Sequence, residues 1–233
     1  MTTRSTHSRF RPAAVWSRIA LAAFCLFSFG CLTPELLNER AERQLADGRL
    51  VEAEESLNLA EEKRPSNWKT QFLMGELRLA QGRPLDAQVA LERAWSMRAI
   101  HPETPEILDR LAEAMLAQGS EAEGKLRRFL TEMTGQYGTP YDYVRKGVFL
   151  MRLNDADGAM TAFNQARAVG ADQDIRLHLA LAAFYRQIGD QRLETLSLRH
   201  ALFLEPQNED VAGRLRELGV VPGPSAELAP PRR

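Results

Sequence analysis

Small and apolar residues recur at a fixed spacing from residue 34 onward. In each unit a small residue is followed seven positions later by a turn residue, and in every unit but the third an alanine and a large apolar residue of the next segment follow. The small residues are spaced 34, 37, 35 and 35 positions apart, at Ala41, Gly75, Ala112, Gly147 and Ala182. A period of roughly 20 to 50 residues indicates a repeat architecture, in which each unit buries its apolar face against its neighbours.

Each unit predicts a pair of helices. The small residue lies midway along the first helix and lets the second helix approach closely, and large apolar residues fill the space between hairpins at Leu57, Leu91, Phe163 and Leu198. A proline inside a helix costs about 3 kcal/mol, and five prolines fall between the units at positions 65, 102, 105, 140 and 206. The predicted units are 34–67, 68–104, 105–139, 140–174 and 175–208, followed by a capping helix over 209–219.

The fifth unit carries the clearest resemblance to a known family. Its pattern resembles the tetratricopeptide repeat (TPR), through His178-x-x-Leu181-Ala182-x-x-Tyr185-x-x-x-Gly189. The resemblance implies an all-α fold, a solenoid of about five helix–turn–helix repeats in a right-handed superhelix, over a domain of 31–219. The third unit departs from the pattern, with Gly124 and Thr131 at the usual alanine positions, so a bend or mobile seam is expected there. Residues 220–233 contain four prolines and predict a flexible or extended tail.

The first thirty residues have a different character. Four arginines precede twelve uncharged residues, 19–30, with no acidic residue in the segment. This is the layout of a bacterial export signal, and it predicts a signal peptide over 1–30. A membrane-spanning helix needs about 20 apolar residues, so an uncleaved anchor is the less favoured alternative.

The end of this segment resembles a bacterial lipoprotein signal, in which a small residue precedes a cysteine. Gly30-Cys31 fits the pattern, whereas Ser28 and Phe29 depart from it. The resemblance implies a covalent lipid on Cys31 and, with Leu32 next to it, attachment to the outer membrane on the periplasmic side. The alternative is cleavage after Ser28-x-Gly30 by the general signal peptidase, which releases a soluble periplasmic protein.

The net charge also differs between the predicted signal peptide and the rest of the chain. The chain has 30 basic and 31 acidic residues, a net charge of −1. Without the four arginines of the predicted signal, 26 basic residues face 31 acidic ones, a net charge of −5. No basic excess predicts a nucleic-acid partner.

Residues suited to catalysis are sparse. Beyond Cys31 there is no further cysteine, and three histidines remain, of which His178 takes the aromatic position of the fifth unit and predicts packing. Asp155-Ala-Asp157-Gly158 lacks the spacing and the glutamate of a calcium loop, and predicts an inter-helix turn. We therefore expect no catalytic residue, no metal, no cofactor besides the lipid on Cys31 and no small-molecule substrate.

The TPR resemblance also implies a groove lined by the first helices, where partner peptides lie. Carried over by register, its residues are Asn38, Glu42, Lys69, Phe72, Glu76, Asp109, Glu113, Tyr141, Arg152, Arg176, Arg186 and Gln187. Their signs predict an acidic N-terminal half and a basic C-terminal half, with Phe72 and Tyr141 as apolar anchors. The alternative is that the charges are ordinary solvated helix faces and that both aromatic residues belong to the core.

Together these features predict a non-catalytic protein-interaction adaptor, or scaffold, of the bacterial cell envelope. Its expected partners are envelope proteins or peptides, together with the membrane through the lipid. One version resembles the outer-membrane TPR lipoproteins that assist type IV pilus assembly. The alternatives are a regulatory or accessory subunit of a cell-wall enzyme, or of an outer-membrane secretion or assembly machine.

Overall fold

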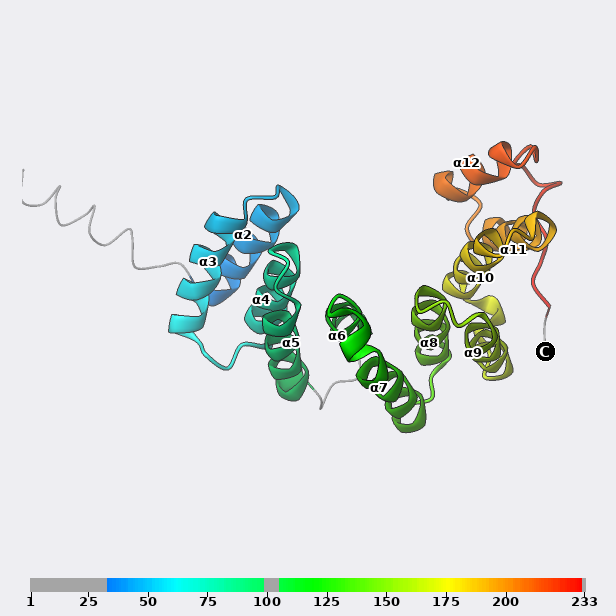
Figure 1. Ribbon diagram of the computed structural model, residues 1–233. Helices are drawn as coiled ribbons and strands as arrows, with labels where there is room; N and C mark the ends of the chain where they lie inside the picture. The colour runs from blue at the N-terminus through cyan, green and yellow to red at the C-terminus, as the bar shows by residue number, and fades with distance from the viewer. Residues whose placement is uncertain (1–32, 99–104, 232–233) are drawn as a thin grey trace, which may run out of the picture.

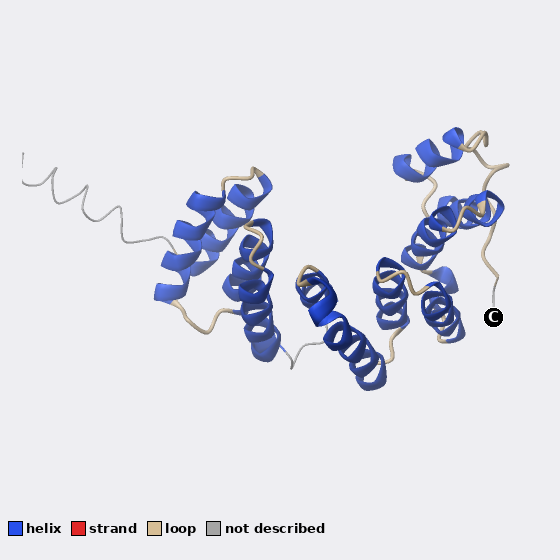
Figure 2. Cartoon of the chain, viewed as in Figure 1, coloured by secondary structure: helices blue, strands red, loops and turns tan. Residues whose placement is uncertain are grey.

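A computed structural model describes residues 33–98 and 105–231 (Figure 1). The first helices of five successive hairpins are α2 (Pro34–Ala46), α4 (Trp68–Ala80), α6 (Pro105–Leu116), α8 (Pro140–Arg152) and α10 (Ile175–Gln187). The second helices are α3 (Leu50–Lys63), α5 (Pro84–Arg98), α7 (Glu123–Gln136), α9 (Ala156–Ala168) and α11 (Gln191–Leu204), and α12 (Glu209–Glu217) follows them. The hairpins lie one after another along an open arc, and no strand occurs among the described residues (Figure 2). The predicted all-α solenoid is confirmed.

The small residues of the repeat lie where two helices meet. A Cβ atom on Gly75 would be 2.5 Å from Leu91 Cγ, and one on Gly147 would be 2.3 Å from Phe163 Cε1. Real Cβ contacts are not this short, so a side chain at either position would displace the large residue opposite. The spacing of small and large residues in the sequence therefore reflects direct helix-to-helix contact within the hairpins.

The hairpin turns use a left-handed backbone. Gly82, seven residues after Gly75, has φ 71°, and Asn154, seven residues after Gly147, has φ 58°. Glycine adopts this conformation without a Cβ penalty, and asparagine is among the few other residues that tolerate it. This explains why asparagine takes the place of glycine in the fourth unit.

The apolar core consists of four clusters that share helices. They involve α2 to α7, then α6 to α8, then α8 to α10, and finally α10 to α12 with Ala226. Because neighbouring clusters meet on common helices, each hairpin is held by the ones before and after it, as expected of a solenoid.

The third hairpin is looser than the others. A short 3-10 helix, η1 (Gly119–Ala122), precedes α7, and α6 packs more extensively against α5 than against α7. The rings of Trp95 and Tyr137 meet edge-on with centroids 5.9 Å apart, which links the second hairpin to the end of the third. This is the unit in which the sequence departs most from the repeat.

The C-terminal segment, 220–233, is the tail predicted to be flexible or extended. Its described part, 220–231, is not helical but lies against α11. Arg199 Nε donates to the carbonyl of Ala226 at 2.8 Å, and Ala226 is buried. Apolar contact with the last cluster and hydrogen bonds from α11 hold the segment in place, which its proline content alone does not reveal.

Candidate functional site

All twelve predicted groove residues lie on the first helices, α2, α4, α6, α8 and α10. We call the surface that these helices present the first-helix face. Its charged side chains are joined by ion pairs that cross from one hairpin to the next.

A ladder of four such pairs connects α2, α4, α6 and α8. Lys69 Nζ lies 3.1 Å from Glu42 Oε1, and Arg110 Nε lies 3.0 Å from Glu76 Oε1. The other two rungs join Asp109 to Arg145 and Glu113 to Arg152. In each rung the acid belongs to one first helix and the base to the following one.

The ladder adds bases to the acidic half of the expected charge pattern along the groove. Glu76 and Asp109 are not free acids, because Arg110 and Arg145, which are absent from the predicted set, neutralise them. The two arginines lie 34 and 36 residues after their partners. One repeat period separates the two residues of each pair, so the repeat spacing in the sequence could have revealed both arginines.

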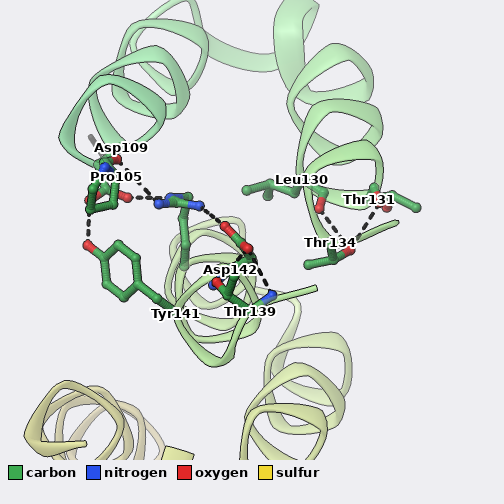
Figure 3. A network of polar contacts seen from close by, with 9 residues as sticks. Pro105, Asp109, Leu130, Thr131, Thr134, Thr139, Tyr141 and Asp142 are labelled. Atoms are coloured by element: carbon green, nitrogen blue, oxygen red, sulfur yellow. Dashed lines mark hydrogen bonds and ion pairs between the residues drawn. The ribbon is translucent and has the colours of Figure 1, made fainter. Parts of the chain in front are cut away.

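Arg145 forms the most buried rung, between the third and fourth hairpins. Its side chain is 1% exposed, and Nη1 lies 2.7 Å from Asp142 Oδ1, while Nη2 donates to the carbonyl of Pro105 at 3.3 Å. Figure 3 shows Pro105, Asp109 and Asp142 gathered around this contact. Asp142 also accepts from the backbone N–H of Thr139 at 3.0 Å, which caps α8. A single guanidinium therefore joins α6 to the beginning of α8.

Tyr141 is part of the same contact. Its hydroxyl donates to Asp109 Oδ2 at 2.5 Å, and two guanidinium groups lie over its ring, with the Cζ of Arg145 4.8 Å and that of Arg176 4.2 Å from the centroid. Burial, with the hydrogen bond to Asp109, raises the pKa of the Tyr141 hydroxyl to about 12. Tyr141 thus joins α6, α8 and α10, and it is half-buried rather than an exposed anchor.

Phe72 is likewise mostly packed. It is 8% exposed and belongs to the first core cluster, with Lys69 Nζ lying 5.4 Å from its ring centroid. Phe72 also lines a hollow of about 460 Å³ on the first-helix face. Phe72 therefore serves both the core and the surface.

The C-terminal end of the face is more open. Arg186 and Gln187 are exposed, and Gln187 Nε2 donates to the carbonyl of Met151 at 3.4 Å. Arg176 pairs with Asp174 at 2.5 Å, at the cap of its own helix. Among the described residues no acid lies within ion-pair distance of Arg186.

Other predicted features lie outside this face. Cys31 and the segment 1–30 are outside the described residues. No helix within residues 33–98 and 105–231 is long and apolar enough to cross a membrane, and these residues contain no cluster of three or more metal-ligand side chains. Asp155 accepts from the Gly158 N–H at 2.9 Å and so caps α9, as the turn interpretation predicts.

A buried histidine pair joins α10 to α11. The rings of His178 and His200 are 5.0 Å apart, and His178 Nε2 lies 2.8 Å from the carbonyl oxygen of Asp172. Burial lowers the pKa of both imidazoles, that of His200 to about 4, and the nearby guanidinium of Arg167 acts in the same direction. Both rings are therefore neutral in the folded protein near pH 7.

This pair predicts a loss of stability in mild acid. The unfolded chain takes up protons near pH 6.5 and the folded chain does so only near pH 4 for His200, so the free energy of unfolding falls as the pH is lowered through this window. Between pH 7.5 and 5.0 we expect a loss of about 1 to 2 kcal/mol, measured by urea denaturation. His200→Leu should flatten the dependence, and an unchanged slope in this variant would contradict the assignment.

Solved structures with the same arrangement of helices are TPR proteins. The crystal structure of a thermophilic TPR protein of Thermus thermophilus is similar with a TM-score of 0.60, over 80% of this chain and 98% of that chain, at 17% identity. A tetratricopeptide repeat protein from Parabacteroides merdae is similar with a TM-score of 0.51, over 79% of this chain and 72% of that chain, at 20% identity. No protein-family model matches the sequence, and no curated protein matches it either. The likeness establishes a TPR-type solenoid fold.

Proposed function

We propose that this chain is a non-catalytic adaptor that holds partner proteins or peptides on its first-helix face in the bacterial cell envelope. The observation that carries the proposal is the hollowed surface across α2, α4 and α6, where Glu42, Lys69 and Phe72 lie side by side. Hollows lined by convergent polar groups and an aromatic edge are typical of binding surfaces. The ion-pair ladder also joins successive first helices across the face, and a preorganised surface lowers the entropic cost of binding.

The location in the proposal rests on the N-terminal sequence. A basic start, an apolar run and Gly30-Cys31 support export and a lipid on Cys31, with the chain attached to the outer membrane and facing the periplasm. Acylation by two or more chains would give stable attachment, whereas a single chain binds only marginally. In the most specific form of the proposal, the chain assists assembly of an envelope complex such as a type IV pilus. In the second form, it is an accessory or regulatory subunit of a cell-wall enzyme or of an outer-membrane secretion or assembly machine.

Bulky labels at single cysteines test the binding face. The only cysteines are Cys25 and Cys31, so a background with Cys25→Ser and Cys31→Ser lets one introduced thiol be labelled with a polymer maleimide. Labels at Glu42→Cys or Gln187→Cys, on first helices, should reduce capture of envelope partners at least tenfold. Labels at Glu52→Cys or Asn164→Cys, exposed on second helices, serve as matched controls. Equal capture by all four labelled proteins would contradict the proposal.

Intact mass and detergent-phase partitioning test the tether. The mature protein should begin at Cys31, carry the mass of its acyl groups and enter the detergent phase, whereas Cys31→Ser should stay in the aqueous phase. An unmodified N-terminus in the wild-type protein would contradict the lipid tether and indicate a soluble periplasmic protein. The proposed binding face would not be affected by this result.

A further inference from the structure

A single hollow runs across the first helices α2, α4 and α6. Two adjoining depressions of about 380 and 460 Å³ share Glu42, Trp68 and Lys69 as lining residues. We call their union the N-terminal groove. First helices that pack about 10 Å apart give it a length of about 20 Å, which about six extended residues would span.

The N-terminal groove is acidic even though its walls contain ion pairs. Three cations, Arg64, Lys69 and Arg110, line it. The carboxylates that line it are Glu35, Glu39, Glu42, Glu76, Glu106 and Asp109. The lining residues therefore carry three more negative than positive charges, and two remain after the pairing of Asp109 with Arg145, which lies outside the lining, is counted.

Two of these carboxylates are the most accessible to a ligand. Glu106 has no cationic partner among the described residues, and Glu39 only approaches Arg43, at 3.7 Å, with both side chains more than half exposed. Exposed pairs of this kind contribute about 0 to 1 kcal/mol. A cation arriving from a partner can therefore replace Arg43 at little cost.

The floor of the groove offers a hydrogen-bond donor that the chain leaves unused. Asn38 is 4% exposed and lines the first depression, and its Oδ1 accepts from Thr70 Oγ1 at 3.0 Å. No group in the described part of the chain accepts from its Nδ2. Nδ2 is not one of the buried polar atoms that lack a partner, so water reaches it in the free protein and a ligand could take the place of that water. The backbone carbonyl of an extended segment is an acceptor of the right kind.

We propose that the N-terminal groove binds an extended segment of a partner protein that is rich in lysine or arginine. The inference rests on the proposed function and adds the chemical class of the partner. Asn38 Nδ2 donates to a backbone carbonyl of the segment, Phe72 contacts an apolar side chain, and Glu39 and Glu106 accept from its cationic side chains.

Fluorescence anisotropy with two synthetic peptides tests the charge class. One labelled peptide of about eight residues alternates lysine and alanine around a single leucine, and its counterpart has glutamate in place of each lysine. The basic peptide should bind at least tenfold more tightly at low salt, and its affinity should fall as salt rises. Comparable affinities, or tighter binding of the acidic peptide, overturn the inference.

Charge-reversal variants locate the binding. Glu39→Lys with Glu106→Lys should weaken binding of the basic peptide at least tenfold, whereas Glu52→Lys with Glu62→Lys, the same charge change on α3, should alter it less than about twofold. Asn38→Ala should weaken binding about fivefold without changing its salt dependence, provided that its melting curve shows a folded protein. Equal losses in the two charge-reversal pairs would reduce the effect to net charge and overturn the inference.

Two further outcomes separate this inference from the proposed function. Self-association that Glu39→Lys with Glu106→Lys abolishes would make a second copy the occupant, and would overturn the inference of a basic partner. If the peptides fail to discriminate while labels at Glu42→Cys still block partner capture, the first-helix face remains the binding face and only the charge class is wrong. If those labels also have no effect, both proposals fail.

Discussion

Gly147→Ala is expected to destabilise the protein by about 2 to 3 kcal/mol, although alanine is the better helix former. The added Cβ would lie 2.3 to 2.8 Å from three ring atoms of Phe163, whose side chain is fully buried between α8 and α9. The ring cannot rotate away without opening the fourth hairpin, so the hairpin itself must shift. Urea denaturation followed by circular dichroism measures the change.

Gly213→Ala provides the matched control. Gly213 lies inside α12, and a Cβ there would have no heavy atom within 4 Å. This variant should gain about 0.5 to 1 kcal/mol, because glycine loses more backbone entropy in a helix than alanine. Opposite signs for the two substitutions would identify close helix approach as the reason for glycine at position 147. A gain in both variants would show that the hairpin accommodates a Cβ freely.

Arg145→Met is expected to cost about 3 to 5 kcal/mol, because it removes one partner from a buried ionic contact. Asp142 would remain buried without its cation, and Asp109 would lose the same partner. The third and fourth hairpins would also lose the hydrogen bond to Pro105. Thermal and urea unfolding of the purified protein give the magnitude.

Arg152→Met is the control for this second prediction. Arg152 pairs with Glu113 in the neighbouring rung, but its side chain is 38% exposed, so its loss should cost about 1 kcal/mol or less. Adding Asp142→Asn to Arg145→Met should recover part of the lost stability, because it removes the stranded charge. Similar losses of unfolding free energy in the two arginine variants would mean that the burial of Arg145 does not determine its contribution to stability.

The repeat pattern predicted the fold because the recurring small and large residues are the ones that contact each other between the two helices of a hairpin. Gly75 and Gly147 recur where Leu91 and Phe163 press against the first helix, so spacing in the sequence corresponds to contact in space. The positions of the groove residues on first helices followed from the same register. Local sequence rules were sufficient for these features because each hairpin contacts mainly its neighbours.

Pairing between hairpins was harder to predict. The repeat period places Arg110 and Arg145 opposite their acidic partners, but the local sequence does not show that Arg145 becomes buried. Which arginine becomes buried depends on the looser third hairpin and on the cap at Thr139. The contact of the tail with α11 was hard to predict for a related reason, since Ala226 and Arg199 belong to segments that no periodicity connects.

The central claim is that partners are held on the first-helix face, and photo-crosslinking in living cells tests it most directly. p-Benzoylphenylalanine would be placed at positions 42 and 187, on α2 and α10, and at positions 51 and 89, which are exposed valines on α3 and α5. We predict adducts with a defined partner from positions 42 and 187 and none from positions 51 and 89. Adducts of equal yield from both faces, or from the second helices alone, would contradict the claim.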